Sequence, residues 1–272
     1  SNKNRKNTET VISVREAWFR YEKDSKDILC GMNFDVHAGE LTCIVGGNGA
    51  GKTTALLTAA GVFAPYRGKV KYRGKPISTF RKDKGSAGKI GVLVQNPLCC
   101  FVMDSVAEEL EATAKAYKLP RSGIEEVIDI MQLQSVLNSN PYDISGGELQ
   151  RAAIAKLLLP EPEVIFLDEA TKGMDAFFKA EFGALLRRLA ARGTAIVLVS
   201  HDIEFCAEFA DRCAMFFNGT VIAEGTAQDV FLGNSFYTTS ACRISRGIIP
   251  DALTSEQVID YANRCERKKN DA

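Results

Sequence analysis

The sequence predicts an α/β protein whose central sheet is mostly parallel, and two observations support this fold class. Four short runs are almost wholly apolar, which is typical of strands covered on both faces. These runs are 41–45, 90–94, 164–167 and 195–199. Helical patterns lie between them, so strands and helices alternate along the chain as parallel sheets require. The helices are expected at 53–60, 104–117, 124–137, 148–158 and 176–190.

Other segments indicate smaller units around this sheet. Alternating polar and apolar residues from Val11 through Tyr21 predict an N-terminal antiparallel β subdomain. Asn218-Gly219 between two β runs predicts a hairpin. Helix signals without a strand signal predict a helical subdomain over about 97–160. We therefore expect a main domain over 1–232 and a C-terminal extension over 233–272 that includes a helix at 255–267.

The composition excludes several classes of protein. The 272 residues include 34 Lys+Arg and 34 Asp+Glu, so no net basic charge attracts nucleic acid or anionic lipid. The hydrophobic fraction of 46% argues against disorder. The eight cysteines form no C-x-x-C pair, and we expect them to be reduced and mostly buried. Ser1-Asn2 resembles a protease-cleavage remnant, so a longer native chain is expected.

The strongest motif is a phosphate-binding loop that fits G-x-x-x-x-G-K-[ST]. It follows an apolar strand and precedes a helix, which is the context that such a loop requires. Glycines let backbone N–H groups converge on phosphate oxygens, and the helix N-terminus adds partial positive charge. We expect Lys52 to contact the β and γ phosphates and Thr53 to hold Mg²⁺. The predicted nucleotide-binding residues here are Gly46, Asn48, Gly49, Ala50, Gly51, Lys52, Thr53 and Thr54.

Two carboxylates, Asp168 and Glu169, follow the buried run 164–167. Open α/β sheets bind their ligands at the carboxyl ends of the strands. Asp168 is therefore expected to coordinate Mg²⁺, directly or through water. Glu169 is suited to orient and deprotonate an attacking water. An acidic pair after a strand is weak evidence alone, but the phosphate loop upstream makes this assignment strong.

The segment Ile144-Ser145-Gly146-Gly147-Glu148-Leu149-Gln150-Arg151 resembles the Leu-Ser-Gly-Gly-Gln signature of ATP-binding-cassette (ABC) ATPases. Its position between the phosphate loop and the acidic pair argues against a plain helix cap. The resemblance implies that Ser145, Gly146, Gly147 and Glu148 bind nucleotide. It also implies the ABC ATPase fold, with ATP and Mg²⁺ as ligands.

The remaining ABC motifs are in order along the chain. Gln95, Asp175 and His201 look like the Q-loop glutamine, the D-loop aspartate and the switch histidine. With Glu169 they form the catalytic set that the resemblance implies, and Gln95 joins Thr53 and Asp168 as a metal ligand. Tyr21 resembles the aromatic residue that stacks on adenine.

Within this family the sequence is most similar to energy-coupling-factor ATPases of vitamin and cobalt importers. The segments that carry this similarity are Gln95-Asn96-Pro97, 105–109 and 225–231. The segments 171–178 and 234–239 resemble the second half of members that carry two cassettes in one polypeptide. Ala170, Met174 and Leu98-Cys99-Cys100 depart from the family pattern, and the last departure lies where the family contacts its membrane partner.

The resemblance implies an ATP hydrolase that powers a bacterial importer from the cytoplasmic face of the membrane, as a peripheral protein. Its implied partners are a second cassette, in a homodimer, a heterodimer or a fused chain, and a transmembrane coupling subunit. The transported substrate stays open between vitamins and metal cations. The alternative is a soluble ABC ATPase that acts on nucleic acid or ribosomes, against which the neutral charge and the absence of a basic linker argue.

Overall fold

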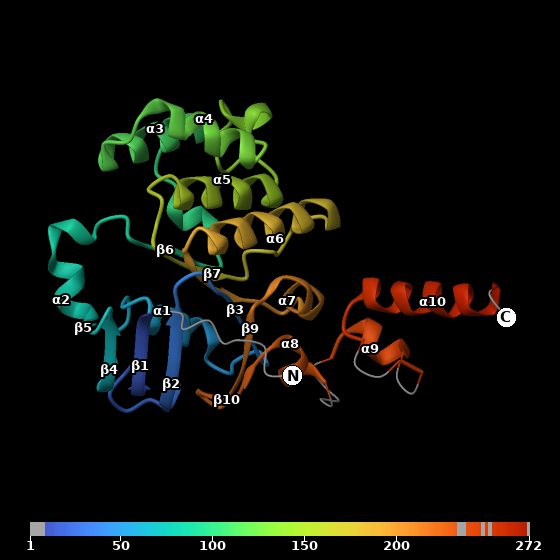
Figure 1. The fold of residues 1–272 in the computed structure, drawn as a ribbon. Helices are drawn as coiled ribbons and strands as arrows, with labels where there is room; N and C mark the ends of the chain where they lie inside the picture. The colour runs from blue at the N-terminus through green and yellow to red at the C-terminus, as the bar shows by residue number, and fades with distance from the viewer. Residues whose placement is uncertain (1–8, 233–237, 246–247, 250–251, 271–272) are drawn as a thin grey trace.

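The computed structural model describes residues 9–232, 238–245, 248–249 and 252–270, and its centre is a six-stranded sheet (Figure 1). The strand order is β10-β9-β3-β8-β7-β6. The strands from β9 to β6 pair in parallel, and β10 pairs antiparallel with β9 at one edge. This confirms the predicted mixed, mostly parallel sheet. Its strands are β3 (Leu41–Val45), β6 (Ile90–Leu93), β7 (Val164–Asp168), β8 (Ala195–Val199), β9 (Arg212–Phe217) and β10 (Thr220–Gly225).

The predicted N-terminal antiparallel sheet is also present, in the order β2-β1-β4-β5. It consists of β1 (Thr10–Phe19), β2 (Leu29–His37), β4 (Arg67–Tyr72) and β5 (Lys75–Pro76). The prediction that β1 continues through Tyr21 is wrong. The Ile28 amide donates to the Phe19 carbonyl at 2.8 Å, so pairing with β2 ends there and the chain leaves the sheet. Tyr21 consequently lies in the loop after β1.

Helices connect the strands and cover the central sheet. The α-helices are α1 (Lys52–Ala59), α2 (Ile77–Lys82), α3 (Val106–Tyr117), α4 (Arg121–Ile130), α5 (Gly146–Leu158), α6 (Ala176–Ala191), α7 (Ile203–Phe209), α8 (Ala227–Phe231), α9 (Ser240–Ser245) and α10 (Ser255–Asn270). Three short 3₁₀ helices are η1 (Lys84–Ser86), η2 (Pro97–Cys100) and η3 (Gln134–Val136). Between β6 and β7 the chain is helical without a strand, and α3, α4 and α5 gather at one end of the molecule (Figure 1).

A single helix over 124–137 is a wrong prediction. Helix α4 ends at Ile130, and Gln132 adopts a left-handed φ of 53° that breaks the helical path. The turn lets Met131 and Leu133 both reach the core, where they are buried. Burial of these two side chains explains why the apolar pattern continued past the end of the helix.

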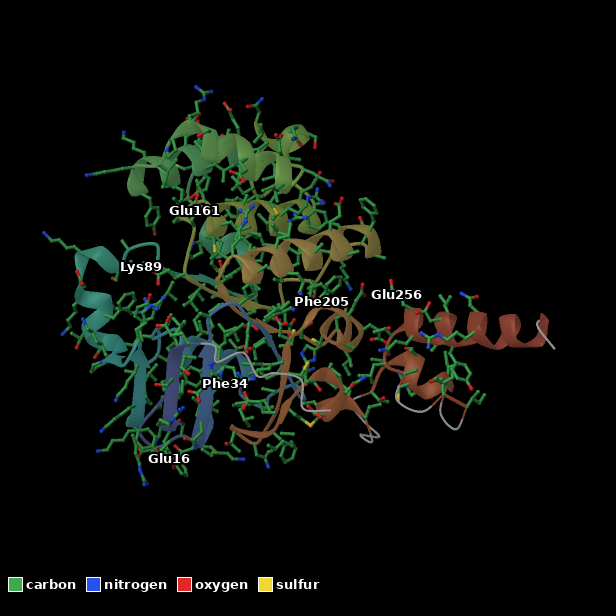
Figure 2. The ribbon with its side chains drawn as sticks, viewed as in Figure 1. Glu16, Phe34, Lys89, Glu161, Phe205 and Glu256 are labelled. Atoms are coloured by element: carbon green, nitrogen blue, oxygen red, sulfur yellow. The ribbon has the colours of Figure 1, made fainter. Side chains whose placement is uncertain are left out.

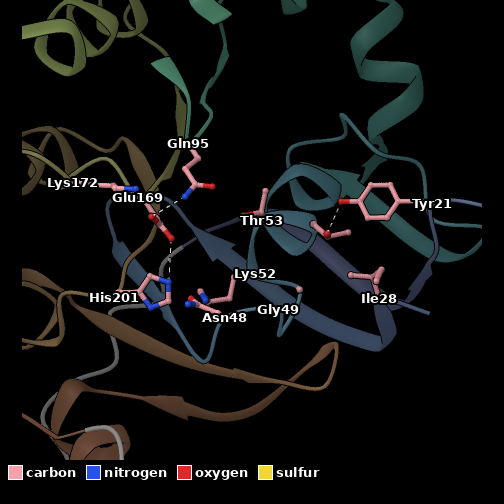
Figure 3. Close-up of a pocket in the computed structure, with 12 residues that line it drawn as sticks. Tyr21, Ile28, Asn48, Gly49, Lys52, Thr53, Gln95, Glu169, Lys172 and His201 are labelled. Carbon is pink, nitrogen blue, oxygen red and sulfur yellow. Dashed lines mark hydrogen bonds and ion pairs between the residues drawn. The ribbon is translucent and has the colours of Figure 1, made fainter. Parts of the chain in front are cut away.

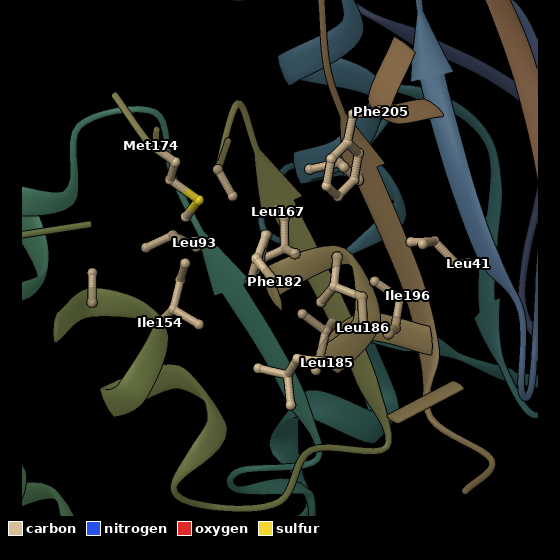
Figure 4. Packing of buried hydrophobic residues seen from close by; sticks show 14 of the residues in the cluster. Leu41, Leu93, Ile154, Leu167, Met174, Phe182, Leu185, Leu186, Ile196 and Phe205 are labelled. Atoms are coloured by element: carbon tan, nitrogen blue, oxygen red, sulfur yellow. The ribbon is translucent and has the colours of Figure 1, made fainter. Parts of the chain in front are cut away.

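Two hydrophobic clusters lie on the two faces of the central sheet. Along β7, Ile165 and Leu167 belong to one cluster and Val164 and Phe166 to the other, because successive side chains point to opposite faces. The first cluster includes side chains of β7, α5 and α6 (Figure 4). The second is shared with α1 and the antiparallel sheet. Phe34 and Phe205, which Figure 2 labels, belong to different clusters. This double covering explains the continuous apolar runs.

The cysteines are free thiols in the described part of the chain, but burial is less common than expected. Cys43, Cys206 and Cys213 are buried. Cys30, Cys100 and Cys242 are half-buried and Cys99 is exposed, so the expectation that most are buried is wrong for these residues.

The C-terminal part contains α9 and the long helix α10, which extends away from the sheets (Figure 1). Ser240 at the start of α9 donates to Glu204 of α7 through its amide and its hydroxyl, each at 2.9 Å. The expected domain boundary at 232/233 and the similarity placed on 234–237 lie outside the described residues, so the boundary stays a prediction. No helix among the described residues has the length and apolar character needed to cross a bilayer.

Candidate functional site

The phosphate-binding loop connects β3 to α1, as its sequence pattern predicts. Backbone crowding explains two of its glycines. A Cβ on Gly46 would lie 2.3 Å from the Phe216 carbonyl oxygen, and one on Gly51, where φ is 99°, would lie 2.9 Å from that of Ile28. The loop therefore fits between the end of β3 and its neighbours only with glycine at these positions.

Lys52 is the first residue of α1, directly after the loop. Its Nζ donates to the carbonyl oxygens of Gly46 and Gly47, each at 2.9 Å, and the residue is only 6% exposed. Burial lowers the pKa of Lys52, while Glu169 and Asp168 act in the opposite direction. The loop thus holds an ammonium group in a fixed place, which suits the binding of an anion.

Asp168, the last residue of β7, contacts Thr53 at the start of α1. The Thr53 hydroxyl donates to its Oδ2 at 2.7 Å, and the residue is 2% exposed. Its other oxygen, Oδ1, is buried and has no hydrogen-bond partner among the described residues. Burial raises the pKa of Asp168, against the effect of the Thr53 hydrogen bond. A buried carboxylate with a vacant oxygen beside a hydroxyl fits the oxygen donor set that Mg²⁺ prefers.

Glu169 is held by two side chains from other parts of the sheet. Gln95 Nε2 donates to Glu169 Oε2 at 3.1 Å, and His201 Nε2 lies 3.1 Å from Glu169 Oε1 (Figure 3). The backbone of Glu169 has a left-handed φ of 52°, which is uncommon outside glycine. The Glu169 amide donates to the Val199 carbonyl at 2.9 Å. Gln95, Glu169 and His201 follow β6, β7 and β8, so three neighbouring strands converge on one carboxylate.

Tyr21 lies at the other end of the site. Its ring makes edge contacts with Phe19 and Phe63, with centroids 5.2 and 5.7 Å apart. Its hydroxyl is 3.0 Å from Thr54 Oγ1, which ties the ring to α1. The residue remains 60% exposed. An exposed aromatic face with a fixed orientation is suited to stacking on a planar base.

Lys52, Glu169 and Tyr21 line a common pocket of about 590 Å³. The pocket is lined by Tyr21, Ile28, Asn48, Gly49, Gly51, Lys52, Thr53, Thr54, Gln95, Glu169, Lys172 and His201 (Figure 3). Sequence reasoning did not select Ile28 or Lys172. The position of Lys172, three residues after Glu169, was the available signal for it. No sequence signal pointed to Ile28, because this residue reaches the pocket only where the chain returns to pair as β2.

Other predicted site residues lie outside this pocket. Gly46 and Ala50 belong to the loop without lining the cavity, and Asp168 lies beneath Thr53. Asp175 caps α6 by accepting from the Phe178 amide at 2.8 Å. The signature residues Ser145, Gly146, Gly147 and Glu148 form the start of α5, away from the pocket.

The start of α5 is stabilised by hydrogen bonds between its own residues. The Ser145 side chain accepts from the Glu148 amide, and the Glu148 side chain accepts from the Ser145 amide, which is a capping box. A Cβ on Gly146 would meet nothing within 4 Å, so the chain approaches open space there.

Comparison with known proteins decides the family. A model described as ABC transporter matches residues 29–172. The chain belongs to this family. It is 38% identical to a putative ABC transporter ATP-binding protein of Bacillus cereus over 94% of this chain and 46% of that protein. It is 33% identical to the energy-coupling factor transporter ATP-binding protein EcfA of Methanocaldococcus jannaschii, over 81% of each chain.

The solved structures agree with this assignment to the ABC family. CbiO1 of Clostridium perfringens, described as part of the ABC transporter complex CbiONQ, superimposes with a TM-score of 0.71 at 30% identity. The match covers 81% of this chain and 90% of CbiO1. The predicted ABC ATPase fold is confirmed, and relatives in the ABC family to which the chain belongs are named as ATP-binding proteins. The chain spans about half the length of the Bacillus relatives it matches.

Proposed function

We propose that this ABC cassette hydrolyses ATP and powers an importer of the energy-coupling-factor type. The observation that carries the proposal is the placement of Glu169 beside the phosphate loop, between Gln95 and His201. Adenine would stack on Tyr21, and the phosphates would extend across Lys52 toward Glu169 (Figure 3). This orientation brings the terminal phosphate to the end of the pocket that contains the carboxylate.

The residues around Asp168 fit a magnesium ion. Thr53, Asp168 and Gln95 would hold it, since each offers an oxygen near the phosphate loop. The vacant Oδ1 of Asp168 needs a partner, and no donor among the described residues bonds to the amide oxygen of Gln95. When bound, Mg²⁺ would neutralise charge that develops on the β and γ phosphate oxygens.

Hydrolysis requires an activated water, and Glu169 is placed to accept its proton. The water oxygen would attack the γ phosphorus as the bond to the β-phosphate oxygen breaks, which gives ADP and phosphate. The Lys52 ammonium would stabilise negative charge on the transferred group. Gln95 and His201 fix the direction of the carboxylate and, through it, the position of the water.

The signature residues support a composite site made by two cassettes. Because Ser145 and Gly146 lie outside the pocket and border open space, they can contact nucleotide only across an interface. We propose head-to-tail pairing in which the signature of one cassette closes over the nucleotide of the other. The second cassette would be another copy, a different chain or the other half of a fused polypeptide, and relatives about twice as long support the last option.

The proposed membrane partner would contact the segment after Gln95. Val102 is 80% exposed and Met103 is 41% exposed, so two consecutive apolar side chains of this segment face solvent. Similarity to EcfA and CbiO1, which are named as components of transporters, supports a transmembrane coupling subunit as the partner. The cassette would then work as a peripheral protein on the cytoplasmic face of the membrane.

The test compares Glu169→Gln with the wild type in Mg·ATP hydrolysis and in size-exclusion chromatography with ATP. We expect the variant to lose turnover by roughly 10²-fold or more and to form an ATP-dependent pair. Glu161→Gln is the matched control, because Glu161 is exposed, lies outside the pocket and also has a left-handed φ, of 51°. Unchanged turnover in Glu169→Gln would refute the assignment.

A further inference from the structure

Lys172 brings a second lysine into the lining of the nucleotide pocket, in addition to Lys52. Its side chain extends toward Glu169 at the end of the pocket opposite Tyr21 (Figure 3). Within the described part of the chain it takes part in no hydrogen bond or ion pair through its side chain. By contrast, Lys52 donates to two loop carbonyls, and Lys156 and Lys179 pair with carboxylates.

The backbone around Lys172 is held in place, so the fold fixes the point from which its side chain extends. Its amide donates to the Glu169 carbonyl at 3.1 Å, which closes a turn directly after the carboxylate. Thr171 and Met174 on either side are 4% and 8% exposed, whereas Lys172 itself is exposed. Gly173 completes the turn with a left-handed φ of 77°. The ammonium therefore extends from an anchored turn over the cavity.

The charges at this end of the pocket give Lys172 a role. Glu169 and the buried Asp168 carry negative charge beside the position proposed for the terminal phosphate, which is itself an anion. An uncompensated carboxylate would repel that phosphate, and an ammonium within several ångströms offsets the repulsion. ADP lacks the terminal phosphate, so it gains little from the same ammonium.

We propose that Lys172 is a nucleotide-binding residue that contacts the terminal phosphate and favours a nucleoside triphosphate over a diphosphate. This inference rests on the proposed function, because it takes the orientation of ATP from it. Lys172 would supply a second cation, which comes from the turn after Glu169 and not from the phosphate-loop motif. The preference it supplies would favour reloading with ATP over rebinding of ADP after hydrolysis.

The experiment measures the affinities of the purified chain for Mg·ATPγS and Mg·ADP by calorimetry, in the wild type and in Lys172→Gln and Lys172→Arg. ATPγS is used because it is hydrolysed slowly. For Lys172→Gln we expect the ratio of ATPγS to ADP affinity to fall roughly tenfold, with ADP affinity nearly unchanged. Lys172→Arg should keep most of the ratio. The wild-type preference should weaken as salt rises, because the ammonium is exposed.

Lys115→Gln is the matched control, since it removes one exposed positive charge on α3, outside the pocket. Equal losses for both nucleotides, or no loss in Lys172→Gln, would overturn the inference while leaving the proposed function intact. If the wild type bound neither nucleotide, both the function and the inference would be wrong. An unchanged thermal midpoint for Lys172→Gln shows that the variant is folded.

Discussion

Thr53 and Asp168 are hydrogen-bonded to one another across the candidate site, with the hydroxyl donating to Oδ2 at 2.7 Å. The bond joins the start of α1 to the end of β7, 115 positions apart in the sequence. The two residues proposed as magnesium ligands are thus neighbours before any ligand binds. The cost of this arrangement is a buried carboxylate whose Oδ1 has no hydrogen-bond partner in the part of the chain that the structure describes.

Replacement of this carboxylate by a neutral amide should stabilise the protein without nucleotide. Burial raises the pKa of Asp168 in the folded state above its ordinary value of 3.8. The folded state therefore holds its proton to higher pH than the unfolded state, and stability falls as pH rises through that interval. We expect Asp168→Asn to be more stable than the wild type at pH 7, by about 1 kcal/mol.

Urea unfolding at several pH values measures this difference. The advantage of Asp168→Asn should be absent well below pH 3.8, grow above it, and become constant above the raised pKa. Stabilisation by Mg·ATP should decrease in the variant, because a proposed metal ligand is lost. A variant less stable than the wild type at pH 7 would show that the carboxylate is compensated in the folded protein.

Tyr21 should contribute to binding of the base and not of the phosphates. Its ring is exposed and held by Phe19, Phe63 and the contact with Thr54. Tyr21→Ala is expected to weaken ATP binding roughly tenfold, the size of one base stacking contact. Tyr21→Phe keeps the ring and should bind almost as the wild type does. Inorganic tripolyphosphate should bind all three proteins equally, and a loss of its affinity in Tyr21→Ala would contradict the stacking role.

The sequence was most informative where residue identity depends on local backbone geometry. The phosphate loop, the buried strand before Asp168 and the Asn218-Gly219 hairpin each have a local cause, and all three elements lie where they were predicted. Asn218 and Gly219, with φ of 45° and 79°, form the turn that the dipeptide indicates. Such features depend on a few adjacent residues, so a single sequence is sufficient to predict them.

Features that depend on distant contacts could not be predicted in the same way. Helix α4 ends early at the turn around Gln132, which buries both Met131 and Leu133, and no periodicity along the chain reveals this turn. Strand β2 pairs with β1 across a long loop, and this pairing places Ile28 in the pocket. Lys172 reads as an ordinary exposed lysine in the sequence, and its pocket position follows from the turn after Glu169.

Gly46 should be the less replaceable of two glycines in the phosphate loop. A Cβ at Gly46 would overlap the Phe216 carbonyl at 2.3 Å, so β9 or the loop would have to move. Gly49 has a left-handed φ of 75° but open space around it. We expect Gly46→Ala to cost about 3 kcal/mol and Gly49→Ala about 1 kcal/mol in urea unfolding. The reverse order would mean that backbone conformation outweighs the close approach.

Glu109 joins three segments of the helical insertion through one buried carboxylate. Its Oε2 accepts from the amides of Val102 and Met103, each at 2.9 Å, and its Oε1 pairs with the Lys156 ammonium. Lys156 also donates to the Cys100 carbonyl. The segment with the exposed apolar residues is thereby attached to α5, whose first residues form the signature.

Loss of this carboxylate should strongly destabilise the cassette. Burial alone would raise the pKa of Glu109, but hydrogen bonds from Lys156, Val102 and Met103 lower it below its ordinary value of 4.5. The stability that Glu109 supplies is therefore present above pH 4.5 and is lost as pH falls through the lowered pKa. We expect Glu109→Gln to cost about 3 kcal/mol in urea unfolding at pH 7.

A double-mutant cycle separates the ion pair from the backbone hydrogen bonds. In Glu109→Gln the Lys156 ammonium is left without its carboxylate, so Lys156→Met should restore part of the lost stability. The restored part measures the cost of the unpaired ammonium, and the remainder measures the weaker hydrogen bonds to Val102 and Met103. The cycle also needs Lys156→Met alone. If the stability lost in the double variant equalled the sum of the losses in the two single variants, Glu109 would act on the 102–103 backbone alone and α5 would be held independently of it.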